Sequence, residues 1–120
     1  MNTRRIGTAS VAEIGLGCMC LSHAYGVPPA PRDAQRVLHR AIELGITTFD
    51  ASVGGIGGSP FAKMAAGNLA TEDLVWMCNG LGIETGLHIE RLAATSAWMS
   101  QQLGRELPGR VARALTSGNG

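Results

Sequence analysis

Extended and helical hydrophobic patterns alternate along the first half of this 120-residue chain. Residues 3–8 and 11–17, separated by a turn at Thr8-Ala-Ser10, predict two short extended segments, and the second is apolar enough to be a buried strand. Residues 22–32 contain three prolines and predict a loop, because proline at this density interrupts both helices and strands. The β-branched run Ile46-Thr-Thr-Phe-Asp50 then predicts a strand of a parallel sheet.

Four stretches carry apolar residues at spacings of three and four, which predicts four helices. The first follows Asp33, whose side chain suits the N-cap, and ends at Gly45. The second begins at Thr71, whose hydroxyl is expected to cap it. Glu72 and Asp73 follow in its first turn, where the helix dipole favours negative charge. The other helices are expected over 85–103 and 108–115, with a frayed tail over 116–120.

Composition narrows the class of protein. With 45% hydrophobic and 16% charged residues the chain is globular, and a net charge of +1 indicates no nucleic-acid partner. We expect no membrane partner, because no apolar run approaches the ~20 residues of a membrane span. No signal peptide is visible, so a cytoplasmic location with reduced thiols is expected. Cys18 and Cys20 are predicted to share one face of a strand as buried thiols.

A glycine-rich stretch between a predicted strand and a predicted helix is the main candidate site. Gly54, Gly55, Gly57 and Gly58 allow positive φ and close approach to a ligand. Loops at this position carry the chemistry of many α/β proteins. The stretch could also hold a phosphate ahead of the helix, although its spacing matches neither a P-loop nor GxGxxG.

Residues 1–51 resemble the N-terminus of the aldo-keto reductases. The matching segments are Thr3-Arg-Arg-Ile-Gly7, Ile14-Gly-Leu-Gly-Cys-Met19 and Leu38-His-Arg-Ala-Ile-Glu-Leu-Gly-Ile-Thr-Thr-Phe-Asp50. The resemblance implies carbonyl reduction with NADPH, and Asp50 stands at the Asp position of the family's catalytic group. Gly55 stands where the family has its proton-donating tyrosine.

Residues 45–115 resemble the C-terminal part of hydroxymethylglutaryl-CoA lyase. The match runs through Phe49-Asp-Ala-Ser-Val-Gly-Gly-Ile-Gly-Gly-Ser-Pro-Phe-Ala62 and Ala66-Gly-Asn-Leu-Ala-Thr-Glu-Asp-Leu-Val75. The resemblance implies cleavage of an acyl-CoA substrate in a TIM barrel with Mg²⁺ or Mn²⁺. Ser59 stands at the position of the family's loop cysteine, and Asn68 matches a metal ligand. The family's other metal ligands, an Asp and a His-x-His pair, have no counterpart.

Together the two resemblances predict a single α/β domain over 1–120. It is a partial TIM-barrel-like (β/α) fragment of two or three strands and about four helices, made of an opening βαβ unit (1–51), a lyase-like loop with C-terminal helices (52–115) and a tail (116–120). Such a sheet cannot close a barrel, so its open edges predict self-association. The join near Phe49-Asp-Ala-Ser52 suggests a fusion or recombined fragment. The predicted function is that of a truncated and impaired lyase. The alternatives are an aldo-keto reductase-like NADPH protein and a non-enzymatic fusion remnant or association module.

Each candidate residue also has a structural interpretation. Ser59 could be a polar loop residue before Pro60, and Asn68 could serve a turn or a cap. Glu72 and Asp73 are better explained by helix electrostatics than by acid–base chemistry. The three histidines are scattered and form no metal-ligand pattern.

Overall fold

The computed structural model of the chain describes residues 2–22, 29–57 and 67–117. The order of its elements along the chain is as follows: β1 (Thr3–Ile6), β2 (Ala9–Ala12), β3 (Leu16–Gly17), α1 (Met19–Ser22), α2 (Pro31–Glu43), β4 (Phe49–Asp50), the 3₁₀ turn η1 (Val53–Gly55), α3 (Thr71–Gly80), α4 (Ile89–Leu103) and α5 (Arg110–Ser117).

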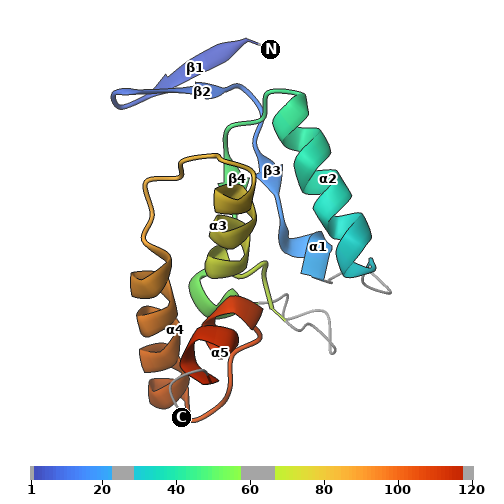
Figure 1. Cartoon of the computed structure of the whole chain (residues 1–120). Helices are drawn as coiled ribbons and strands as arrows, with labels where there is room; N and C mark the ends of the chain where they lie inside the picture. The colour runs from blue at the N-terminus through green and yellow to red at the C-terminus, as the bar shows by residue number, and fades with distance from the viewer. Residues whose placement is uncertain (1, 23–28, 58–66, 118–120) are drawn as a thin grey trace.

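Strands β1 and β2 form an antiparallel hairpin that projects from one end of the molecule (Figure 1). Ile6 pairs with Ala9, so the turn consists of Gly7 and Thr8 rather than the predicted Thr8-Ala-Ser10. Gly7 has φ +61°, which suits the tight turn of a two-residue hairpin. The extended run predicted over 11–17 is therefore divided between β2 and β3.

The predicted βαβ unit is confirmed in outline: β3 pairs in parallel with β4, and α2 connects them. Helix α2 begins at Pro31, two residues before the predicted Asp33, and Ala30 occupies the N-cap without a side-chain hydrogen bond. Proline is tolerated there because the first-turn N–H groups have no partner within the helix. After the helix, Gly45 adopts φ +85°, as predicted for its end.

The strand predicted over 46–50 is shorter in the structure, because only Phe49 and Asp50 pair in β4. Cys18 is fully buried, as predicted for the thiols, but it follows β3, and Cys20 lies in helix α1 rather than on a strand. Beside β3 and α2 an open hollow of about 850 Å³ is lined in part by Leu16, Val37 and Ile46. Among the residues of β3 and β4, only Leu16 lines it.

Helices α3, α4 and α5 pack around η1 and form the larger body of the molecule (Figure 1). Val75 and Cys78 of α3, Ala93 of α4 and Ala112 of α5 are buried in it, together with Leu107 from the α4–α5 connection. The apolar spacing that predicted α3 corresponds to a buried side at Val75 and Cys78, whereas Leu81, just after the helix, is 45% exposed.

The predicted start of α3 at Thr71 is confirmed, but its predicted capping role is wrong: Thr71 makes no capping hydrogen bond, since Ala70 is the N-cap. Helix α4 begins at Ile89 instead of Thr85, and α5 runs over Arg110–Ser117 instead of 108–115. The predicted end of α4 at residue 103 is confirmed, and Gly104 follows it in the left-handed conformation with φ +61°. Of the predicted tail, residues 118–120 lie outside the described part.

The fold is an α/β fragment of a TIM-barrel type, with a short parallel sheet and helices on it. None of the helices in the described ranges is long and apolar enough to cross a membrane.

Candidate functional site

The glycine-rich stretch has two arms, residues 52–57 and 67–71, which are held together by backbone hydrogen bonds. The Ser52 N–H donates to the Leu69 carbonyl at 3.0 Å, and the Thr71 N–H donates to the Ser52 carbonyl at 2.9 Å. Ser52, two residues after β4, also forms an isolated parallel bridge with Ala70. This closure brings η1 against the N-terminal end of α3.

Positive φ angles in the stretch are confirmed at Gly54, Gly55 and Gly57, with values of +70°, +69° and +120°. The fourth glycine, Gly58, lies outside the described residues. A Cβ at Gly57 would stand 2.6 Å from the Asn68 amide nitrogen, and one at Gly67 would collide with the Gly55 carbonyl oxygen. Glycine is therefore required by close packing between the two arms as well as by backbone conformation.

Glu72 is the buried anchor of the stretch. Its side chain is fully inaccessible, and both carboxylate oxygens accept the Gly54 N–H, at 2.9 and 3.1 Å. Gly109 packs so closely on this carboxylate that a Cβ there would collide with Oε1. A buried carboxylate needs hydrogen-bond donors, so Glu72 fixes η1 to the first turn of α3.

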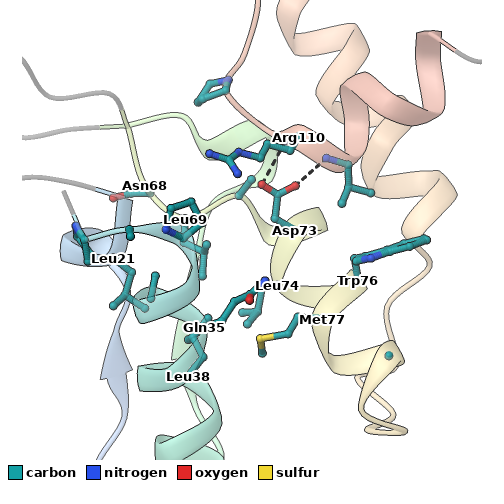
Figure 2. A pocket seen from close by; sticks show the side chains of 18 residues that line it. Leu21, Gln35, Leu38, Asn68, Leu69, Asp73, Leu74, Trp76, Met77 and Arg110 are labelled. Carbon is teal, nitrogen blue, oxygen red and sulfur yellow. Dashed lines mark hydrogen bonds between the residues drawn. The ribbon is translucent and has the colours of Figure 1, made fainter.

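Asp73, the next residue, connects α3 to α5. Its Oδ1 accepts the Val111 N–H at 2.8 Å, and its Oδ2 accepts the Arg110 N–H at 3.2 Å (Figure 2). These are the unsatisfied amides of the first turn of α5, so Asp73 caps a helix 37 residues further along the chain. Glu72 and Asp73 stand in the first turn of α3, as predicted. Their hydrogen-bond partners, however, lie on η1 and α5.

The three predicted site residues have different outcomes. Ser59 lies outside the described residues. Asp50 ends β4 and is exposed. Asn68 is half-buried, and its amide nitrogen donates to the Ile56 carbonyl at 3.2 Å. The structure thus brings Asn68 onto the first arm of the loop, in the turn-stabilising position that was its structural interpretation.

The described residues do not suit a divalent cation by themselves. They contain no group of three or more His, Cys, Asp or Glu side chains in ligating arrangement. Asn68 could offer only its amide oxygen, since the nitrogen is bonded to Ile56, and Mg²⁺ prefers near-octahedral oxygen coordination. His39 on α2 and His88 before α4 are both exposed and on different elements.

Two buried groups near the loop were not predicted as site residues. Ser96 of α4 is 3% exposed, and its hydroxyl oxygen would stand 2.9 Å from a Cβ at Gly54. Cys78 of α3 is 6% exposed, and burial raises the pKa of its thiol. Ser96 is 42 residues from Gly54 along the chain, so no local pattern in the sequence marks its position.

A groove lies between α2 and α3 and reaches the N-terminal end of α5; we call it the α2–α3 groove (Figure 2). Its cavity volume is about 830 Å³. The lining is mainly apolar, and its polar members are Gln35, Asn68, Asp73 and Arg110. No sequence pattern indicated this groove, because its walls come from segments predicted as separate units.

Comparison with known proteins finds similarity to acyl-CoA lyases. Over 74 residues, 62% of this chain, the sequence is 54% identical to (R)-citramalyl-CoA lyase of Chloroflexus aurantiacus and 49% identical to mitochondrial hydroxymethylglutaryl-CoA lyase of Mus musculus. The chain spans about a quarter (23%) of the length of these curated relatives. No family model matches it.

Solved structures give the same result. Hydroxymethylglutaryl-CoA lyase from Pseudomonas aeruginosa aligns over 71% of this chain and 28% of its own, with a TM-score of 0.65 and 38% identity. A lyase from Acinetobacter baumannii, in complex with coenzyme A and 3-methylmalate, aligns over 64% of this chain and 25% of its own, with a TM-score of 0.60 and 43% identity. The lyase resemblance and the partial TIM-barrel class are confirmed. The aldo-keto reductase resemblance of residues 1–51 stays a prediction.

Proposed function

We propose that this chain carries the substrate-loop module of a carbon–carbon lyase acting on a 3-hydroxyacyl-CoA. The observation that carries the proposal is the identity of about half the residues over 74 positions to lyases of this type, together with the anchored loop. The A. baumannii relative is described with coenzyme A, which supports an acyl-CoA as the partner.

Within this module Ser59 is the residue proposed to act at the substrate, in place of the relatives' loop cysteine. A serine hydroxyl ionises far less readily than a thiol at neutral pH, so it would hydrogen-bond the substrate rather than act as a base. Asn68 would contribute an amide oxygen, and Asp50 stands at the carboxyl end of β4, where parallel sheets place ligands. The chain is therefore proposed to be an impaired lyase.

A divalent cation, Mg²⁺ or Mn²⁺, is proposed to belong to the complete site rather than to these residues. When bound, such an ion would polarise the substrate's oxygens. The missing oxygen ligands would have to come from other polypeptide, because Asn68 alone does not suit the ion. We further propose that the chain associates with itself through the open sheet edges beside β3, and that it is cytoplasmic.

A direct assay tests the lyase proposal. Wild-type chain and Ser59→Cys are incubated with 3-hydroxy-3-methylglutaryl-CoA and Mg²⁺, and acetoacetate is measured. We expect Ser59→Cys to form acetoacetate faster, since a thiol restores the ionisable group. Ser10→Cys, which places a thiol in the exposed hairpin, is the control and should match wild type. Absence of acetoacetate from both wild type and Ser59→Cys would contradict lyase activity of the chain.

One observation favours keeping the reductase alternative: the parallel β3–α2–β4 unit is the arrangement that the aldo-keto reductase resemblance implies for residues 1–51. Under this proposal NADPH would be the cofactor. A fluorescence titration with NADPH is the test, and no change in nucleotide emission would reject it.

A further inference from the structure

We propose that the α2–α3 groove is a binding site for a carboxylate with an unbranched apolar chain, and that Arg110 holds the carboxylate. The proposal does not rest on lyase activity, because Arg110 and the apolar walls have no part in the proposed lyase site, although Asn68 borders both. Three observations carry it: the volume of the groove, its apolar walls and an arginine that is outside the ion pairs of the described residues.

The walls of the groove suit an apolar chain. Leu38 of α2 is buried at its base, while Leu74 and Met77 of α3 are partly exposed on the facing wall (Figure 2). A volume of about 830 Å³ lies within the ~300–1,000 Å³ typical of small-molecule sites. Covering these side chains removes apolar surface from water, which favours a ligand with a hydrocarbon chain.

The charges along the groove favour an anionic end group. Among the described lining residues the only carboxylate is that of Asp73, and both of its oxygens already accept backbone N–H groups of α5. The Arg110 guanidinium takes part in none of the ion pairs of the described residues. A guanidinium pairs with a carboxylate through two parallel hydrogen bonds, so Arg110 can receive the ligand's head group.

A second copy of the chain is a less suitable occupant. The open sheet edge belongs to β3 and β4, and none of the residues of those strands lines the groove. Association through the sheet would therefore leave the groove accessible. Arg110, the one cationic side chain among the described lining residues, lies beside apolar walls and is complementary to an amphiphilic anion, whereas a protein surface would require complementarity over a larger area.

Trp76 provides a direct reporter, because it lines the groove and is 59% exposed, while Trp98 lies outside the lining. In a Trp98→Phe background, the fluorescence emission of Trp76 is followed while decanoate or 1-decanol is added. Decanoate is kept below its micelle-forming concentration, and 1-decanol is kept below its solubility limit. We expect a saturable change with decanoate. Replacing Arg110 by Gln should weaken decanoate binding about tenfold, since a charge-assisted pair is lost, and leave decanol binding unchanged.

Arg113→Gln is the matched control, because Arg113 is exposed on the same helix but does not line the groove. This variant should bind decanoate like the parent. If Arg110→Gln does not fold, as judged by circular dichroism, salt titration of the parent replaces it: added salt should weaken decanoate and not decanol binding. The proposal would be overturned if decanoate produced no saturable change in Trp76 emission. It would also be overturned if Arg110→Gln or added salt weakened decanoate binding no more than decanol binding. The proposal would also be overturned if light scattering gave the mass of a dimer and decanoate changed neither that mass nor the Trp76 emission.

Discussion

At the scale of single residues, the loop depends on Glu72. A fully buried carboxylate that accepts one backbone N–H through both oxygens orders the turn at Gly54. Gly109 packs against the other side of the carboxylate and allows the approach. The same side chain therefore joins the loop, α3 and the connection to α5.

Replacing Glu72 by Ala should destabilise the chain by about 1–3 kcal/mol, because the buried Gly54 N–H loses its acceptor. Glu72→Gln should cost less, since it keeps one acceptor oxygen. The midpoint of urea unfolding measures both. Glu84→Ala, at an exposed position, is the control and should change stability by no more than ~0.5 kcal/mol. An equal midpoint for Glu72→Ala and Glu84→Ala would refute the anchoring role.

Cys78 predicts how stability responds to alkaline pH. Burial raises the pKa of its thiol above the ordinary 9.0, so the unfolded chain loses this proton at lower pH than the folded chain. The stabilising contribution is thus complete below 9.0 and is lost as the pH rises toward the folded value. We therefore expect the free energy of unfolding to begin to fall as the pH rises above 9.0. In Cys78→Ala the fall should be smaller, and identical pH profiles would contradict the expectation.

Residue roles could be predicted from the sequence only where the signal was local. The positive φ of Gly54 and Gly55 followed from the density of glycine, and the acids of the first turn of α3 were recognised as electrostatic groups. Their partners could not be predicted, because Asp73 and Val111 are 38 positions apart. Asn68 suited either a turn or a cation, and its bond to Ile56 is a tertiary contact without a sequence pattern.

At the scale of elements, α5 depends on a cap from another helix. It has eight residues, too few to be stable alone in water, and Asp73 of α3 satisfies two of its first amides. Packing of Ala112 into the body adds to this. The attachment of α5 is therefore an interaction of tertiary structure.

Replacing Asp73 by Ala should loosen α5 while leaving the rest of the body folded. Loss of a cap costs about 1 kcal/mol, which corresponds to roughly five- to tenfold faster amide exchange in the capped turn. Hydrogen exchange with mass spectrometry of a peptide covering 108–117 measures it. Asp33→Ala is the control: Asp33 lies in the first turn of α2 and faces Arg36 at 3.7 Å. Unchanged exchange in the 108–117 peptide of Asp73→Ala would rule out the capping role.

Helix ends were easier to predict than helix starts. Gly45 and Gly104 take positive φ where the apolar periodicity stops, and that conformation is specific to glycine. The start of α3 at Thr71 was correct, but two other starts were displaced because polar side chains offered caps that the backbone does not use. Pro31 rather than Asp33 opens α2, and Ile89 rather than Thr85 opens α4.

At the scale of the whole molecule, the sheet is incomplete. Two strands of two residues each cannot close a barrel, and the chain spans about a quarter of its lyase relatives. The hollow beside β3 and α2 is open among the described residues. The incompleteness of the sheet was predictable from the count of strands. The α2–α3 groove was not, because it depends on how far apart two helices lie.

The open edge of β3 gives the last prediction. The Leu16 N–H donates to Thr48 toward β4, and since successive strand residues alternate, the Gly17 N–H points to the free edge. Light scattering after size exclusion should give a mass above the monomer's 12.5 kDa, rising with concentration. Gly17→Pro removes the free N–H and should shift the mass toward the monomer. Gly17→Ala keeps it, meets no atom within 4 Å, and should associate like wild type. A wild-type monomer at all concentrations would contradict edge pairing, and so would equal masses for the two variants.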